Sequence, residues 1–314
     1  MKKLLAYLIL GTVTFSEYKI ENGNVTYKGY NHRNGKFITE DKNLNGSVDL
    51  KTFKELTLFY ASDKNNVYYK GEIVEGADPK NFEVIRMDFG KDGKYMYYGK
   101  YRLDIDPLGF SFLGRTSNES ITQVRINPTQ YVKNYNSVYY MSVDSEYDKV
   151  EFLKKLDDAD SKSFESWSAS LGKDKNNVYY NGKKVSYIDV KTYDGNGYGY
   201  SKDKNNHYYI IKKIENADYK SFKAYKSGDF NYSHNYAKDK YHVFYNGEII
   251  EGADPKSFKI LKNDFGKDKT GYYYKEQWLR GVKNEEIENL INSAWSKKTV
   301  VPGYDYTKNK DFNE

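Results

Sequence analysis

The 314-residue chain is predicted to be a mainly β protein made of tandem repeats of about 29 residues, each a small β-meander with a single helical turn. Three observations support this prediction. A block of the type DKNNVYY recurs along the chain, and a second block of the type ADPKSF follows it in phase. In addition, 35 Tyr and 16 Phe supply large apolar areas to a chain with only 38% hydrophobic residues.

The Asp that begins the first block sets the period. Intervals of 29 residues separate 63 from 92, 174 from 203 and 239 from 268. The interval of 36 between 203 and 239 places seven extra residues in the segment KSGDFNYSHN. Clear copies begin at Asp63, Asp174, Asp203 and Asp239, and looser copies cover about 24–53, 92–113, 132–167 and 268–282. An aromatic marker in the second block follows the same period, at Phe53, Phe82, Phe110, Phe164, Tyr193, Phe222 and Phe258.

The first block predicts a turn followed by a hairpin. DKNN is a turn, because Asp caps local N–H groups and Asn tolerates left-handed backbone angles. VYY is β-branched and aromatic, which favours a strand. Asn181-Gly182 and Asn246-Gly247 then predict two-residue type I′ hairpin turns, followed by a return strand.

The second block predicts one helical turn and a further short strand. Asp78 and Asp254 are placed as N-caps, with Pro79 and Pro255 at the first helical position, and the marker Phe is expected to point inward. Because about 29 residues cannot bury their own apolar face, neighbouring copies must stack. Unequal copies favour an open repeat array, and a closed propeller-like ring is the alternative.

The two ends of the chain have their own predictions. Lys2-Lys3, the apolar stretch 4–15 and the small residues Thr14 and Ser16 predict a signal peptide over 1–16, cleaved before Glu17; a buried first strand is the alternative. N-terminal repeats, including divergent copies, follow over 17–131, and C-terminal repeats over 132–282. A capping helix and a loose tail are expected over 283–314, with Ile287, Leu290, Ile291 and Trp295 on the apolar face of the helix.

Composition excludes several classes of function. The absence of Cys excludes disulfides, thiol catalysis and Cys-ligated metals. A net charge of +6 comes from interleaved acidic and basic residues, so no nucleic-acid-binding tail is expected. No nucleophile, metalloprotease or nucleotide-binding motif occurs, and His207 replaces the Val of sister copies, so it is expected to pack rather than to catalyse. The chain is therefore predicted not to be an enzyme.

The repeated blocks resemble the bacterial DKNYY repeat family. The resemblance rests on DKNNVYY at 63–69 and 174–180, DKNNHYY at 203–209 and the weaker DKYHVFY at 239–245, each followed by a block of the ADPKSF type. It covers most of 54–113 and 173–276. The resemblance implies an exported repeat protein, and the family has no established activity to carry over.

One segment resembles a calcium loop. In DKNLNGSVD, Asp41, Asn43, Asn45, Gly46 and Asp49 fit positions 1, 3, 5, 6 and 9 of an EF-hand-type loop. Position 12 is Thr52 instead of the bidentate Glu, so no cofactor is expected beyond weakly bound calcium. The alternative is a solvated turn, because 48–53 is also the local version of the second block.

Two rows of aromatic residues follow the repeat. The row five residues after each Asp contains Phe244, so its hydroxyl is dispensable there and the row is expected to lie in the core. Adjacent strand residues face opposite sides, so the other row is expected nearer solvent, with packing between stacked copies as the alternative. This second row keeps its hydroxyl in every copy and is the candidate binding surface; it comprises Tyr69, Tyr98, Tyr180, Tyr209, Tyr245 and Tyr274.

The sequence therefore predicts a non-enzymatic, exported scaffold that binds a protein at the cell envelope. A periplasmic, cell-surface or secreted location is expected, with no membrane span in the mature chain. The alternative partner is a carbohydrate or cell-wall glycan stacked on the second Tyr row. A degenerate hydrolase or an inhibitor is a further alternative, and the sequence leaves the oligomeric state open.

Overall fold

The computed structural model describes residues 7–9, 12–14, 17–33, 36–44, 46, 48–113, 129–144, 149–195, 199–225, 235–262, 264–292 and 300–305. The chain divides into two compact units, Met1–Lys175 with Asn181–Lys183 and Asn176–Tyr180 with Lys184–Glu314. The predicted boundary between residues 131 and 132 lies inside a strand of the first unit, β15 (Thr129–Lys133).

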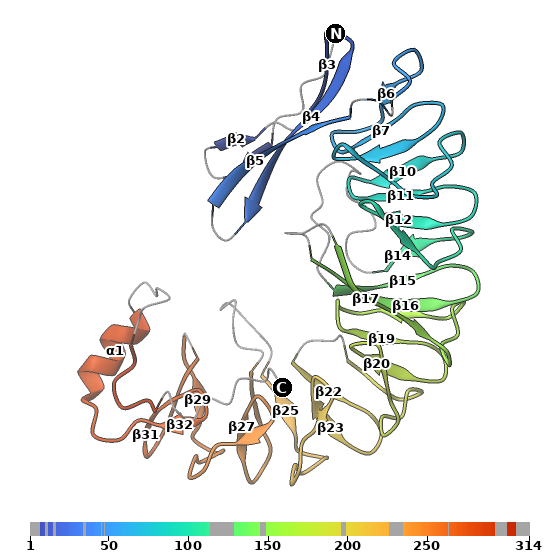
Figure 1. Cartoon of the computed structure of the whole chain (residues 1–314). Coiled ribbons are helices and arrows are strands. Elements are labelled where there is room, and N and C mark those ends of the chain that lie inside the picture. Colours follow the sequence, from blue (N-terminus) through green and yellow to red (C-terminus); the bar gives the residue numbers. More distant parts are fainter. Residues whose placement is uncertain are drawn as a thin grey trace. The chain divides into compact units, whose positions relative to one another are not determined.

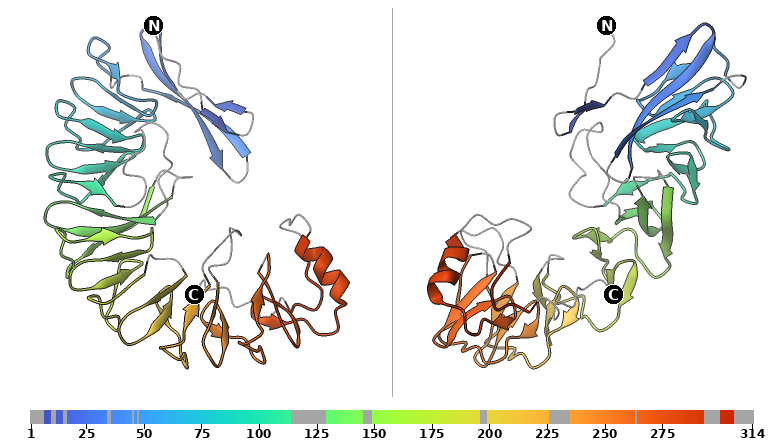
Figure 2. Two further views of the ribbon diagram at one scale, coloured as in Figure 1. Left: turned by 180° about the vertical axis from the view of Figure 1, so that it is seen from behind. Right: turned by 60° about the vertical axis from the view of Figure 1, so that its left-hand side comes forward.

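The first unit is a succession of antiparallel sheets (Figures 1 and 2). A two-stranded hairpin, β1 (Tyr7–Ile9) and β2 (Thr12–Thr14), precedes the sheet β3 (Glu17–Glu21), β4 (Asn24–Arg33) and β5 (Lys36–Asn43). The next sheets are β6 (Lys54–Glu55), β7 (Tyr60–Ser62), β8 (Val67–Tyr69) and β9 (Glu72–Ile73), and then β10 (Glu83–Arg86), β11 (Phe89–Lys91), β12 (Met96–Tyr98) and β13 (Tyr101–Leu103). The unit continues with β14 (Ser111–Phe112), β15, β16 (Val138–Asp144) and β17 (Lys149–Leu156), and with the pair β18 (Glu165–Ser166) and β19 (Leu171–Lys173).

The second unit repeats the same plan. After β20 (Val178–Tyr180) and β21 (Lys183–Val185) come β22 (Tyr200–Lys202), β23 (His207–Tyr209) and β24 (Lys212–Lys213). The last two sheets are β25 (Lys223–Ala224), β26 (Tyr236–Lys238), β27 (Val243–Tyr245) and β28 (Glu248–Ile249), and β29 (Lys259–Ile260), β30 (Phe265–Asp268), β31 (Gly271–Tyr274) and β32 (Gln277–Trp278). The prediction of a mainly β tandem-repeat protein is confirmed, and none of the described sheets closes on itself.

The hairpin turns follow the predicted chemistry where Asn-Gly is present. Asn246 and Gly247 have φ angles of 50° and 81°, and they join Tyr245 and Glu248, which are directly paired. Asn181 and Gly182 have the same signs, as a type I′ turn requires. At the corresponding turn after β23, Ile210 has a φ of 57°, an unfavourable value for a β-branched residue.

The predicted helical turn is present in the second block. The N–H of Phe258 bonds to the carbonyl of Asp254 at 3.0 Å, and Asp254 Oδ1 accepts the N–H of Lys256 at 3.1 Å. Phe258 is buried, as expected, and its ring lies directly against Gly266 of β30. A Cβ at Gly266 would lie 2.2 Å from this ring, so glycine is needed where the ring crosses the strand.

Helix α1 (Asn284–Asn292) lies beside the last sheet (Figure 1). Its Ile287 and Ile291 are buried in one apolar cluster with Phe265 and Tyr272. Val301 and Tyr304 belong to the same cluster, so the segment 300–305 is packed and is not the loose tail expected from the sequence. Trp295, placed on the helix by the sequence, lies outside the described residues, as do 226–234 of the predicted insertion.

Candidate functional site

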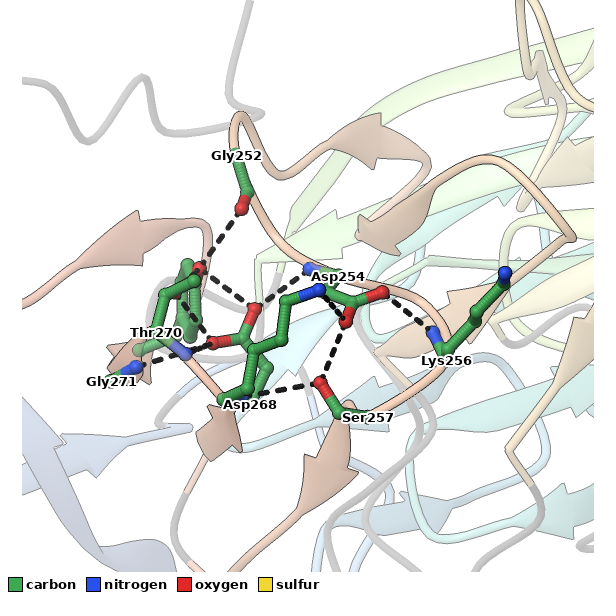
Figure 3. Close-up of polar contacts among 9 residues, drawn as sticks. Gly252, Asp254, Lys256, Ser257, Asp268, Thr270 and Gly271 are labelled. Atoms are coloured by element: carbon green, nitrogen blue, oxygen red, sulfur yellow. Dashed lines mark hydrogen bonds and ion pairs between the residues drawn. The ribbon is translucent and has the colours of Figure 1, made fainter.

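The Asp that begins each repeat is buried and bonded to the backbone around it. Asp268 Oδ1 accepts the N–H groups of Thr270 at 2.7 Å and Gly271 at 3.2 Å, which forms an Asx turn. Its Oδ2 accepts the N–H of Asp254 at 2.7 Å and the hydroxyl of Tyr273 at 3.1 Å (Figure 3). We call this arrangement the Asp box, and it recurs around Asp63, Asp92 and Asp203.

The Asp box favours the charged carboxylate. Burial of Asp268 raises its pKa, but the donors from the backbone, Thr270 and Tyr273 lower it by more, so the pKa lies below its usual range. The pKa values of Asp63, Asp92 and Asp203 are lowered against burial in the same way. These carboxylates therefore serve the fold as anions.

The Lys that follows the box Asp binds the second block. Lys269 Nζ lies 2.8 Å from Asp254 Oδ2, and its backbone N–H donates to Ser257 Oγ at 3.2 Å (Figure 3). The Lys269 side chain holds the pKa of Asp254 at about 2, helped by the Lys256 N–H and the Ser257 hydroxyl. The same ion pair joins Lys64 to Asp49, Lys175 to Asp160, Lys204 to Asp189 and Lys240 to Asp218. The Lys of the first block and the Asp of the second block therefore form ion pairs with each other.

Asn134 replaces the box Asp in the divergent copy. Its Oδ1 accepts the N–H groups of Asn136 and Ser137 at 3.0 and 2.8 Å, as a box Asp does. Its Nδ2, however, donates to the carbonyl of Asp106 at 3.0 Å. Where a box Asp accepts an N–H, Asn134 thus donates to a carbonyl, so the side chain and the opposite backbone group have exchanged roles.

The second Tyr row is not the exposed surface considered from the sequence. Tyr69, Tyr98, Tyr245 and Tyr274 are buried, whereas Tyr180 and Tyr209 are half-buried. Tyr69 donates to Asp88 Oδ1 at 2.8 Å and Tyr209 to Asn235 Oδ1 at 3.2 Å, and both acceptors belong to the next sheet. The row therefore packs between stacked copies and has polar partners there, and a glycan cannot stack on it as a continuous row.

The first Tyr row lies in the core, as predicted, but its hydroxyl groups form hydrogen bonds there. Tyr68, Tyr97 and Tyr208 are buried and donate to Oδ2 of their box Asp at 2.7 to 2.9 Å, as Tyr273 does. Phe244 lacks this hydroxyl, and its copy keeps the backbone donors to Asp239, with His242 Nδ1 3.5 Å from Asp239 Oδ1. Tolerance of Phe in one copy therefore did not show that the hydroxyl is unused in the others.

A third Tyr row, three residues before the box residue, links consecutive sheets. Tyr60 donates to the carbonyls of Gly99 at 2.7 Å and Asp88 at 3.2 Å. Tyr200 donates to the Asn235 carbonyl at 2.8 Å and accepts the Gly247 N–H at 3.1 Å. Tyr131 and Tyr236 make equivalent bonds. This row was not predicted from the sequence, although Tyr recurs at this position in several copies.

The comparison with known families agrees with this repeated architecture. The family model described as "DKNYY family" matches residues 6–101, 112–212, 200–253 and 236–313. The chain belongs to the DKNYY family. No curated protein and no solved structure matches it. The DKNYY blocks are those that form the Asp boxes and the Tyr rows, so the family signature describes the framework of the fold.

The candidate calcium loop does not have the shape of an EF-hand loop at its start. Asp41 and Asn43 lie in the extended strand β5, paired with Lys28 and Thr26 of β4. Asp49 is bound by Lys64 at 2.6 Å, and Asn45 lies outside the described residues. No group of three or more His, Asp or Glu that could hold a metal ion occurs in the described part of this DKNYY chain.

His207 packs inside its copy, as the sequence indicated. Its ring stacks on Phe222 with centroids 4.2 Å apart, and Nε2 lies 3.1 Å from the Tyr219 carbonyl. Burial lowers the pKa of His207 below its usual value. The neutral ring therefore suits this apolar position.

The exposed residues at the start of the return strand differ in chemistry between several copies of this DKNYY protein. Each return strand begins with two residues that are exposed or half-exposed, directly after the hairpin turn. These pairs are acidic and aliphatic, aromatic and basic, doubly basic, or amide and aromatic: Glu72-Ile73, Tyr101-Arg102, Lys183-Lys184, Lys212-Lys213, Glu248-Ile249 and Gln277-Trp278. We call these six pairs the return-strand pairs. The pairs occupy the same position after each of these hairpin turns, but their side chains differ in charge and polarity.

Two return-strand pairs of the first unit line a shallow depression of about 820 Å³. It is formed by Glu72, Ile73, Glu75, Gly76, Lys100, Tyr101 and Arg102. Both oxygens of Glu72 are engaged, one by Lys42 and one by Lys100. The depression therefore carries side chains that the repeat framework does not use, among them Ile73, Tyr101 and Arg102.

Proposed function

We propose that this DKNYY protein is an exported, non-enzymatic scaffold that binds a partner protein at the bacterial cell envelope through its return-strand pairs. The proposal rests on the observation that, within each copy, one set of residues holds the fold together and another set faces solvent. The repeated Asp, Lys and Tyr residues bond to one another and to the next copy, whereas the return-strand pairs vary in chemistry and face solvent. Repeat proteins use such a constant framework to present a variable binding surface.

The chemistry of the return-strand pairs suits protein recognition. Tyr101 and Trp278 are 43% and 41% exposed, and each neighbours a basic side chain: Arg102 follows Tyr101, and Arg280 lies over the Trp278 ring. Tyr, Trp and Arg are the residues that contribute most to protein interfaces. The pairs are also held on short strands, so little order is lost when a partner binds.

Export is supported by the N-terminal composition. Lys2-Lys3 followed by the apolar stretch 4–15 has the order of charge and hydrophobicity of a signal peptide. Within the described residues, no helix is long and apolar enough to cross a membrane. Alkaline phosphatase fused after residue 40 tests the proposal, since this reporter is active only outside the cytoplasm. Activity that persists in a Leu8→Arg variant, or that is absent from the unaltered fusion, contradicts export.

Binding is tested by retention of envelope proteins on the immobilised chain. Variants at two return-strand pairs, Arg102→Glu and Lys213→Glu, should lose a retained protein without a change in thermal unfolding. The matched control is Lys220→Glu, which reverses an exposed charge outside the pairs. Equal retention by all three variants contradicts the assignment of binding to the return-strand pairs.

A further inference from the structure

The outer edge of β13 has backbone groups free for pairing. In the hairpin of β12 and β13, Tyr98 pairs with Tyr101 around the two-residue turn Gly99-Lys100, and Tyr97 pairs with Arg102. Residues that flank a two-residue turn form the hydrogen-bonded pair, so the next pair is a non-hydrogen-bonded one. The N–H and C=O of Arg102 therefore point away from β12. No other described strand pairs with β13, although β17 of the next sheet packs near it.

The edge of β9 repeats this geometry on the other side of the depression. Tyr69 pairs with Glu72 around its turn, and Tyr68 pairs with Ile73. Ile73 is therefore the equivalent of Arg102 and also directs its backbone groups to a free edge. Its side chain is 36% exposed. The depression thus lies between two consecutive strand edges, with an aliphatic contact on one and an aromatic contact, Tyr101, on the other.

The charged side chains that line the depression differ in whether they already have an ionic partner. Glu72 is neutralised by Lys42 and Lys100. Arg102 stacks its guanidinium on the Tyr95 ring, 4.6 Å from the centroid, and pairs with no carboxylate among the described residues. Stacking fixes the plane of the guanidinium while leaving its N–H edge available to a carboxylate. Glu75 also lines the depression, is exposed and pairs with no basic side chain among the described residues. The unpaired charges are therefore Glu75 and Arg102, and Arg102 is the exposed cation, fixed by its ring contact, beside the strand edge.

We propose that an extended segment of a partner protein adds to the edge of β13 and places an acidic side chain on Arg102. Pairing with an exposed edge supplies backbone hydrogen bonds, and side chains on alternate positions supply specificity. An apolar residue of the segment lies against Tyr101 or Ile73. This inference deepens the proposed scaffold function and rests on it.

Two blocked peptides test the proposal: acetyl-TVEVET-amide and its lysine counterpart acetyl-TVKVKT-amide. Backbone amide chemical shifts of the full chain are followed during titration. The acidic peptide should shift residues 73–76 and 100–103, and the lysine peptide should not. Arg102→Gln should weaken binding of the acidic peptide about tenfold or more. The matched control is Arg280→Gln, since Arg280 also lies over an aromatic ring, Trp278, at 4.9 Å and is exposed.

Three outcomes overturn the inference. The acidic peptide leaves the shifts of 100–103 unchanged at millimolar concentration, both peptides bind equally, or Arg102→Gln binds the acidic peptide as the unaltered chain does. A separate readout distinguishes failure of this site from failure of the scaffold. If an envelope protein is retained equally by the unaltered chain and by Arg102→Gln, the scaffold stands and this site is wrong.

Discussion

Asp203 Oδ2 accepts the N–H of Asp189 at 2.9 Å and the hydroxyl of Tyr208 at 2.7 Å, so one oxygen joins the second block of one copy to the first block and the core Tyr of the next. Asn134 shows the complementary arrangement, because its Nδ2 donates to a carbonyl. The identity of the box residue is therefore matched to the backbone group opposite it. This relationship can be tested by exchange.

Asp203→Asn is expected to destabilise the protein by roughly 2–3 kcal/mol, since either the amide N–H₂ meets two donors or one acceptor of the box is lost. Asn134→Asp should also destabilise, because it sets a carboxylate against the Asp106 carbonyl. Chemical denaturation measures both. Lys204→Ala, which removes only the exposed pairing to Asp189, should have a small effect. If Asp203→Asn is as mild as Lys204→Ala, the box is not the link described.

Tyr60→Phe should lower the free energy of unfolding by about 1–2 kcal/mol, because the carbonyls of Gly99 and Asp88 lose their donor. The ring itself is tolerated, since Phe89 occupies the same position in the next copy. Tyr101→Phe is the control, as its exposed hydroxyl has no hydrogen bond within the described structure. Equal stability of the two variants would show that the third Tyr row does not link the copies energetically.

Ile210→Asn should stabilise the protein by about 1 kcal/mol. Ile210 has a φ of 57°, whereas the equivalent turn position is Asn181 or Asn246 in sister copies. A left-handed conformation costs a β-branched residue roughly 1–2 kcal/mol, and Asn adopts it more readily. Part of this gain is offset because the Ile210 side chain is half-buried. A rise in the midpoint of thermal unfolding checks the prediction; Ile211→Asn, beside it and without a positive φ, should give none.

The period and the turns could be read from the sequence because they depend on local chemistry. The N–H of Asp218 reaches Asp239 Oδ2 across 21 residues, whereas the same bond spans 14 residues in other copies, which places the seven-residue insertion between them as expected. Asn246-Gly247 likewise adopts the turn that its side chains favour.

The burial of the second Tyr row could not be predicted from local sequence. Alternation along a strand shows that Tyr68 and Tyr69 face opposite sides, but not whether a neighbouring sheet covers each side. In the structure the next copy covers Tyr69 and supplies Asp88 as its partner. The bonds of Tyr60 were missed for the same reason, since their acceptors lie 28 and 39 residues further along the chain. Contacts between copies are tertiary, and the repeat pattern describes one copy.

The last prediction concerns Asp264, because burial disfavours the charged form of its carboxyl group. Burial raises the pKa of Asp264 above its usual value, although Lys275, Asn235 and Tyr245 act to lower it, and Oδ1 has no hydrogen-bond partner. A carboxyl group with a raised folded pKa contributes its full stability below its unfolded pKa of about 3.8 and loses it as pH rises through the folded value. At neutral pH, where the carboxyl group of the unfolded chain is ionised, burial of Asp264 therefore destabilises the fold.

Asp264→Asn should accordingly raise the midpoint of thermal unfolding at pH 7, and the difference from the unaltered chain should shrink below about pH 4. Asn also tolerates the φ of 59° at this position. The box carboxylates lose stability in acid in both proteins, so only the difference between the two is diagnostic. Asp104→Asn, which removes an exposed negative charge, controls for the change in net charge. A gain that is absent at pH 7, or that is equally large at pH 3.5, would show that burial of the Asp264 charge does not limit stability.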